Sequence, residues 1–149
     1  MVTFQLERHK MVYSLKQLIM EKPIIQEIKR ICGKMQSIQH VGCLFKLGDI
    51  DCMYMDYKDP HLLKFTIPCL ACIDSGNRQQ VTNIINQLNR EVKYVKTFLL
   101  DNGCVSLVYE RRIMEGEETG HVVPHVIKTL DFAAGYVKQR IFSKKKQVR

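Results

Sequence analysis

The chain has 149 residues, of which 46% are apolar and 26% are charged. These are the proportions of a globular domain, and they exclude a collagen, a coiled coil and an intrinsically disordered chain. Lysine and arginine outnumber aspartate and glutamate by 23 to 15, a net charge of +8, and no run reaches the roughly 18–20 apolar residues of a membrane helix. We therefore expect one domain over residues 1–142, without a membrane segment, followed by a basic flexible tail over residues 143–149.

The first ten residues, MVTFQLERHK, contain neither an apolar core segment nor a small-residue cleavage site. We therefore expect no secretory signal and a cytoplasmic location. Thiols stay reduced in that compartment, and a chain of this length needs no disulfides to hold its core. We expect six free thiols that pack as small apolar side chains: Cys32, Cys43, Cys52, Cys69, Cys72 and Cys104.

Residues 1–36 predict two helices, because apolar side chains recur at three- and four-residue intervals on both sides of Pro23. Proline is tolerated in the first turn of a helix, so Pro23 fits the start of the second one. The apolar period then changes to two. Residues 41–47 and 50–57 therefore predict two strands, which a turn at Gly48 joins into a hairpin.

A third strand is predicted over residues 62–73, with Ile67 and Cys69 on one face and Pro68 on the other. Because Pro68 has no N–H for a ladder hydrogen bond, its part of the strand must be an edge or a bulge. Cys69 and Cys72 form a C-x-x-C motif, but in a regular strand they point to opposite faces. We interpret the motif as structural rather than as a zinc or redox site, which needs converging sulfur atoms.

The second half of the chain predicts a helix, a hairpin and a final helix. Val81, Ile84, Ile85 and Leu88 form one apolar stripe at helical spacing. Strands over residues 92–100 and 104–113 flank the sequence Asp-Asn-Gly, for which we predict a type I′ turn because Asn-Gly accepts positive φ angles.

The last helix is expected to begin near residues 122–124, after an acidic loop, and to reach Ile141. Its inward stripe is predicted to contain Val123, Val126, Ile127, Leu130, Ala134, Val137 and Ile141.

The predicted order of elements is α-α-β-β-β-α-β-β-α. Hairpins dominate, so we expect an antiparallel five-stranded sheet with helices packed on one face, an α+β domain.

The element order over residues 41–141 resembles that of the YbjN family. The most similar stretches are DSGNRQQVTNIINQLN and, after it, KYVKTFLLDNGCVSLVYE. That family shares its fold with the type III secretion chaperones. The resemblance implies a small, non-enzymatic, often dimeric domain that binds other proteins or acts in regulation, and it brings no catalytic residues. The helical extension over residues 1–36 and the basic tail depart from the family pattern.

No catalytic, cofactor or metal site is predicted. The chain lacks the phosphate-binding motifs GxxxxGK[ST] and GxGxxG and the nucleophile motif GxSxG. His121 and His125 are one helical turn apart, but HExxH is absent, and we interpret them as an exposed pair at a helix start.

Phe132 and Tyr136 lie off the inward stripe of the last helix, one turn apart, with His125 nearby. Two aromatic side chains on an outer flank indicate either packing under the N-terminal helices or a protein interface. Together with the strand at Pro68, we take these residues as interface candidates, and we expect a homodimer through the last helix with a client protein bound beside it.

The tail carries the cations Lys144, Lys145, Lys146 and Arg149. No aromatic residues alternate with them, so the sequence favours a solvated tail over base stacking. The resulting hypothesis is a non-enzymatic protein-binding, chaperone-like or regulatory module without a cofactor. The alternative is a basic regulator that contacts nucleic acid through this tail.

Overall fold

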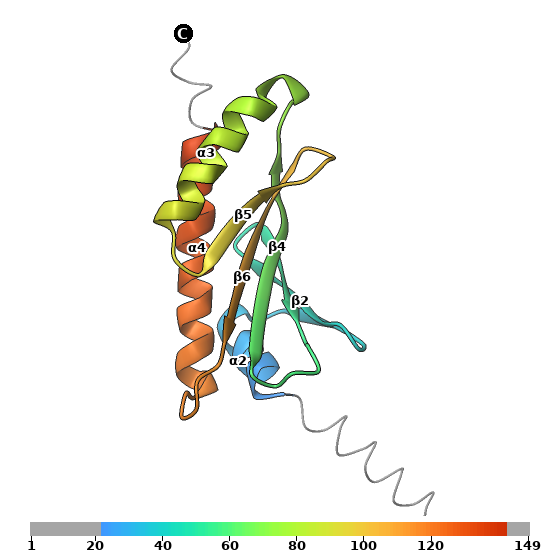
Figure 1. The fold of residues 1–149 in the computed structure, drawn as a ribbon. Coiled ribbons are helices and arrows are strands. Elements are labelled where there is room, and N and C mark those ends of the chain that lie inside the picture. The colour runs from blue at the N-terminus through green and yellow to red at the C-terminus, as the bar shows by residue number, and fades with distance from the viewer. Residues whose placement is uncertain (1–21, 143–149) are drawn as a thin grey trace, which may run out of the picture.

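The computed structural model describes residues 22–142, which form an α+β domain with helices packed against one face of an antiparallel sheet (Figure 1). The predicted first helix and the basic tail lie outside these described residues. The elements are α2 (Pro23–Cys32), β1 (Met35–Ile38), β2 (Gly42–Leu47), β3 (Ile50–Met55), β4 (Leu62–Cys72), a 3-10 turn (Ser75–Asn77), α3 (Arg78–Glu91), β5 (Val95–Leu99), β6 (Cys104–Arg112) and α4 (Thr119–Phe142).

The sheet has six strands in the order β1-β2-β3-β4-β6-β5, and every neighbouring pair is antiparallel. The prediction of five strands was wrong, because it extended the second helix through residue 36. Gly33 ends α2 at Cys32: it has a φ of 80°, and its N–H bonds to the carbonyl of Lys29. Glycine adopts this angle without a Cβ penalty, so the chain leaves the helix and β1 begins two residues later.

The core lies between the sheet and α4. The alternation of β4 and β6 places one row of each strand against the helices, and α4 contacts both strands. The fully buried side chains of these two rows are Leu63, Phe65, Ile67, Val105, Leu107 and Tyr109. The predicted inward residues of β4 up to Ile67 are therefore confirmed.

On the opposite face of the two central strands, two buried hydroxyl groups are hydrogen-bonded across the pair. The hydroxyl of Thr66 donates to the carbonyl of Leu107 at 3.0 Å, and that of Ser106 donates to the carbonyl of Ile67 at 3.1 Å. These bonds link β4 to β6 through side chains as well as through the backbone ladder, so the pair forms the stiff centre of the sheet.

Pro68 lies in a β-bulge of β4. Ile67 pairs with Leu107 and Ala71 pairs with Val105, so four steps along β4 match two steps along β6. β3 pairs with β4 only up to Thr66, so the strand is also an edge on that side from Pro68 onward. The expectation of an edge or bulge at Pro68 is confirmed, and its cause is the missing N–H.

The predicted hairpin between β5 and β6 is present, but its turn is not type I′. That type requires positive φ at both central residues. Gly103 has a φ of 87°, whereas the positive-φ residues of other types in the described chain are His40 and Tyr94 alone. The N–H of Gly103 instead donates to the carbonyl of Leu100 at 3.0 Å, and Leu100 then pairs with Cys104.

α4 begins at Thr119, earlier than predicted, and Pro124 lies inside it. A proline there removes one hydrogen bond to the carbonyl of Gly120. The buried stripe of α4 contains Val122, Val123, Val126, Leu130, Ala133, Ala134 and Val137, while Ile127 and Ile141 are half-buried. No helix in residues 22–142 is both long enough and apolar enough to cross a membrane.

The contact between Gly42 and β3 predicts a large loss of stability in the Gly42→Ala variant. A Cβ at this position would lie 1.9 Å from the carbonyl oxygen of Tyr54, and the φ of 149° is itself unfavourable for other residues. We expect the free energy of unfolding to fall by roughly 2 kcal/mol or more, measured by urea denaturation.

Gly135→Ala is the matched control, because Gly135 is exposed on α4 and its added Cβ meets no atom within 4 Å. Alanine has the higher helix propensity, so this variant should gain about 0.5–1 kcal/mol. Equal stabilities for the two variants would contradict the described pairing of β2 with β3.

Candidate functional site

A groove of about 680 Å³ runs beside α4, between its outer flank and the segment that follows α3. We call it the α4 groove. Its lining residues are Glu91, Val92, Lys93, Tyr94, His125, Lys128, Thr129, Phe132 and Tyr136. It brings together three of the four interface candidates from the sequence: Phe132, Tyr136 and His125.

The aromatic pair on α4 forms one wall of the groove. Phe132 and Tyr136 stack with ring centroids 5.9 Å apart and planes inclined by 16°. Phe132 is 66% exposed, whereas Tyr136 is half-buried against the core. The prediction that both lie off the buried stripe therefore holds most fully for Phe132. Of the two N-terminal helices that were the alternative cover for these rings, the second, α2, does not line the groove, and residues 1–21 lie outside the described residues.

Tyr94 lines the groove from the segment that follows α3, and its position was not predicted from the sequence. It has a φ of 68°, an uncommon angle for a tyrosine, and β5 begins only at the next residue. Its ring lies 6.0 Å from the ring of Tyr109 and 6.4 Å from that of His125, edge-on to the imidazole. Because 52% of Tyr94 stays exposed, it offers apolar area to a ligand while its inner edge is held in place.

The rim of the groove carries one carboxylate and two lysines, and the carboxylate already accepts hydrogen bonds within the chain. The hydroxyl of Tyr136 donates to Glu91 at 2.7 Å, which lowers the pKa of that carboxyl, and Gln87 donates to it as well. Arg140 lies over the ring of Tyr136 at 5.6 Å. Lys93 and Lys128 are both exposed on the rim. The groove therefore combines an apolar wall with a cationic edge.

A second, more polar hollow of about 570 Å³ lies at the start of α4 and shares His125 with the α4 groove. Arg111 from β6 holds Glu117 with two hydrogen bonds, at 2.9 and 2.8 Å, and also donates to the hydroxyl of Tyr109. The guanidinium of Arg111 holds the pKa of Glu117 at about 2, with help from the N–H of Met114. This clamp fixes the acidic loop before α4.

His121 and His125 lie on the exposed side of the first turns of α4, as the sequence predicted. His121 lies 3.9 Å from the carboxylate of Glu118. In residues 22–142 the one group of three or more side chains placed to hold a metal ion consists of cysteines, not of these histidines.

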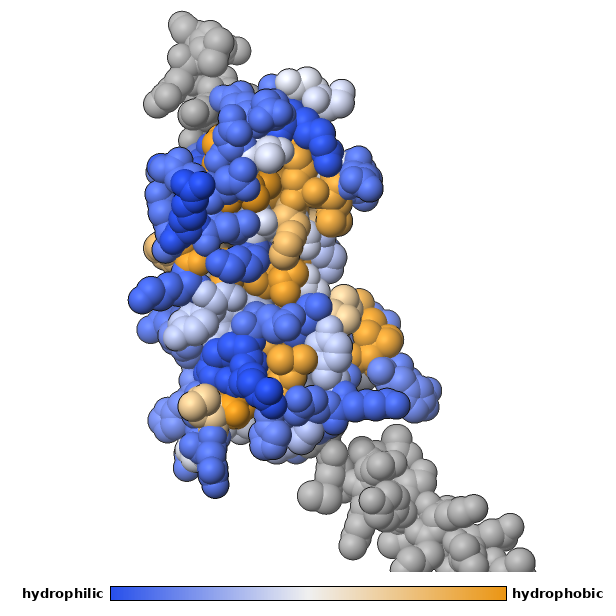
Figure 2. Space-filling view, viewed as in Figure 1, coloured by the Kyte–Doolittle hydropathy of each residue, from blue (hydrophilic) through white to orange (hydrophobic). Residues whose placement is uncertain are grey.

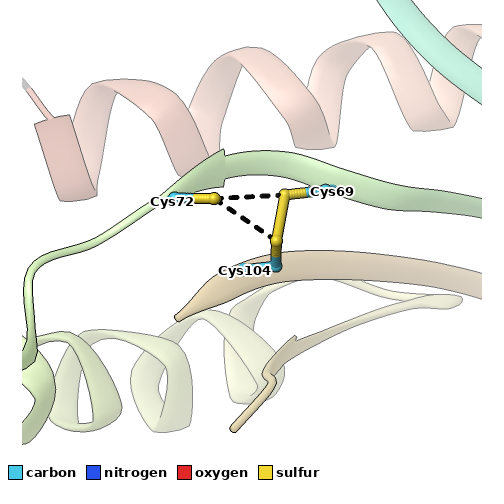
Figure 3. A group of neighbouring side chains, drawn as sticks. All are labelled: Cys69, Cys72 and Cys104. Carbon is cyan, nitrogen blue, oxygen red and sulfur yellow. Dashed lines mark hydrogen bonds between the residues drawn. A yellow bond between two sulfur atoms is a disulfide. The ribbon is translucent and has the colours of Figure 1, made fainter. Parts of the chain in front are cut away.

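The three cysteines Cys69, Cys72 and Cys104 meet where β4 ends and β6 begins (Figure 3), and none of them lines the α4 groove. Two predictions were wrong here. The sulfur atoms of Cys69 and Cys72 converge at 3.6 Å instead of pointing to opposite faces, because the bulge at Pro68 breaks the two-residue period. Cys69 and Cys104 are joined in a disulfide, so not all six thiols are free.

The remaining candidates lie apart from the groove or beyond the described residues. Pro68 belongs to the bulge near the cysteines and does not line the groove. The four basic residues of the tail fall within the undescribed segment 143–149. The surface in Figure 2 is mostly hydrophilic, and apolar side chains interrupt it in separate patches.

The sequence matches no protein-family model and no curated protein. Its fold resembles that of YbjN from E. coli, a protein described in its crystal structure as a candidate transcription regulator. The two structures superpose with a TM-score of 0.53 over 75% of this chain and 84% of YbjN, with 14% sequence identity. The likeness shows a YbjN-like α+β fold, which confirms the fold expected from the sequence resemblance.

The clamp between Arg111 and Glu117 predicts a pH-dependent loss of stability in the Glu117→Gln variant. The pKa of Glu117 is lowered in the folded state, so its contribution is present above the ordinary carboxyl pKa of 4.5 and disappears as the pH falls through about 2. We expect urea denaturation to find the variant less stable at neutral pH and equal to wild type near the lower value.

Glu118→Gln serves as the control, because Glu118 is exposed and contacts only His121 at 3.9 Å among the described ion pairs. It should change stability little. If the difference in unfolding free energy between Glu117→Gln and wild type stayed constant across this pH range, the clamp would be contradicted.

Proposed function

We propose that the chain is a non-enzymatic protein-binding module of the regulatory or chaperone-like kind, and that the α4 groove is its docking surface. The observation that carries the proposal is that Phe132 and Tyr94 both line one groove and stay exposed, at 66% and 52%. Aromatic side chains of this kind dominate the centres of protein interfaces.

The chemistry of the groove selects the partner. Its walls are aromatic, and Glu91 on the rim is occupied by Tyr136 and Gln87. Lys93 and Lys128 remain as exposed cations beside the apolar wall. We therefore infer a partner segment that inserts a bulky apolar side chain next to an acidic residue. Complementary charge would also speed its association with a chain of net charge +8.

We also propose a homodimer through the outer flank of α4, with the partner segment bound beside the contact. Phe132 offers an apolar ring outside the monomer's core, and a two-fold contact would use it twice. The regulatory role rests on the likeness to YbjN, which extends only to the fold. Nucleic acid is the alternative partner, and the tests below separate it from a protein.

Peptides that carry an aromatic or large aliphatic residue beside two acidic residues should bind the groove. We expect selection from a random peptide library on the full chain to enrich such sequences. When such a peptide binds, the NMR shifts of the protein's backbone amides should change at the end of α3, at Tyr94 and in the middle of α4. Tyr94→Ser should weaken binding at least about tenfold. Phe98→Ser is the control, because Phe98 is exposed to a similar degree, 48%, but lies outside the groove.

Shift changes that map elsewhere, or equal affinities for the two variants, would contradict a docking role for the groove. The salt dependence of the peptide affinity gives a second criterion. The double variant Lys93→Glu, Lys128→Glu should lose most of that dependence. Tight binding of single-stranded DNA or RNA with a steep salt dependence, in place of peptide binding, would favour the nucleic-acid alternative.

Self-association is expected to depend on the aromatic pair of α4. Light scattering over a dilution series should show a dimer for wild type at high micromolar concentration and a monomer for the double variant Phe132→Ser, Tyr136→Lys. The control Phe98→Ser should remain dimeric. A monomeric wild type, or a double variant that dimerises equally well, would contradict the proposed contact.

A further inference from the structure

We propose that Cys69, Cys72 and Cys104 of the reduced chain form a zinc site with three thiolate ligands and one open coordination position. This proposal is independent of the α4 groove, because none of the three cysteines lines it. The three sulfur atoms lie within 4.8 Å of one another, and their side chains turn toward a common point in Figure 3.

The sulfur positions suit the size of the ion. A tetrahedral Zn²⁺ with bonds of about 2.3 Å separates its sulfur ligands by about 3.8 Å. The sulfur of Cys72 lies 3.6 Å from that of Cys69 and 3.3 Å from that of Cys104. The Cα atoms of Cys69 and Cys104 are 5.3 Å apart, so their thiols stay neighbours once the disulfide is opened. Small side-chain rotations then produce the ligand set.

The bulge at Pro68 creates this convergence. Cys72 and Cys104 are direct cross-strand partners, and Cys104 precedes the buried Val105, so both point away from the core. In a regular strand Cys69 would point into the core with Ile67. Within the bulge it is exposed instead, and the next residue packs against the core. The site therefore depends on the irregular part of β4.

The same geometry argues against disulfide exchange as the main chemistry. An attacking thiolate approaches a disulfide along the axis of the sulfur–sulfur bond. The sulfur of Cys72 has nearly equal distances to both sulfurs of the Cys69–Cys104 bond, so it lies beside that bond. Three sulfurs around one centre are the arrangement of a metal site.

Other cysteines of the chain are less suited to supply thiolate ligands. Burial raises the pKa of Cys52 to about 12 and also raises that of Cys32, so neither readily supplies a thiolate. Cys69 and Cys72 are exposed, and Cys104 is half-buried. Binding releases the ligand protons to solvent and leaves one negative charge on the complex, in a chain with a net charge of +8. Water can reach the fourth position.

The test uses the full chain, reduced and then freed of reductant under anaerobic conditions. Titration with Zn²⁺ should show one site per chain, with heat that depends on the buffer because protons are released. Co²⁺ in its place should give intense thiolate-to-cobalt absorption, and X-ray absorption of the zinc form should show three sulfur neighbours at about 2.3 Å.

Cys72→Ser should weaken Zn²⁺ binding at least about tenfold and reduce the thiolate absorption, since it removes one ligand. Cys32→Ser is the matched control and should bind as wild type does. Circular dichroism checks that each variant is folded. The oxidised chain provides a test without substitution: with Cys69 and Cys104 joined, it should not bind.

Absence of one-to-one binding to the reduced chain would overturn the proposal. Binding by the oxidised chain, or by Cys72→Ser with wild-type affinity, would place the zinc elsewhere and overturn it equally. A loss of Zn²⁺ affinity as large in Cys32→Ser as in Cys72→Ser would also overturn the proposal.

Discussion

The packing of α4 against the core face of β4 and β6 is the contact on which the rest of the structure depends. A helix can bury only one stripe of its surface against a sheet, and α4 uses small and branched side chains for that stripe, from Val122 to Val137. Outside the stripe, α2 packs against one part of α4, and α3 packs against another. Because α3 ends at Glu91 and the chain turns at Tyr94, the flank that carries Phe132 stays open. The α4 groove is thus a consequence of how the core is filled.

The central strand pair also determines the second chemical feature of the molecule. β4 and β6 are held together over their length by paired backbone groups and by the hydroxyls of Thr66 and Ser106. The ladder is irregular only where Pro68 cannot donate a hydrogen bond. That irregularity brings three sulfur atoms together on the face away from the core. The groove and the cysteine cluster are therefore separate features, one on the helical layer and one on the sheet.

Much of the fold follows from the sequence, because hydrophobic periodicity reports directly on burial. The β2–β3 and β5–β6 hairpins, the amphipathic α3 and most of the inward face of α4 were predicted, and so was the position of Phe132 off that inward stripe. Local backbone geometry was harder to predict. The second helix was expected to reach residue 36, whereas the positive φ of Gly33 ends α2 and makes room for a sixth strand.

The parts of the two sites that were missed depend on irregular backbone. Tyr94 has strand propensity, and nothing local indicates that its φ is positive, so its place in the groove needs the tertiary structure. The cysteine cluster could have been found. Pro68 predicted an edge or a bulge immediately before Cys69, and a bulge invalidates the two-residue period that was then used to separate Cys69 from Cys72.

We propose that the aromatic flank of α4 is free in the monomer and becomes covered by a partner or a second copy. A fluorinated phenylalanine introduced at position 132 of the full chain tests it directly, because the fluorine resonance shifts between H₂O and D₂O only when solvent reaches the ring. We expect a solvent-dependent shift at the lowest concentration that diminishes as the chain is concentrated or as a groove-binding peptide is added. A ring that is shielded at every dilution, or one that stays exposed whatever is added, would contradict it.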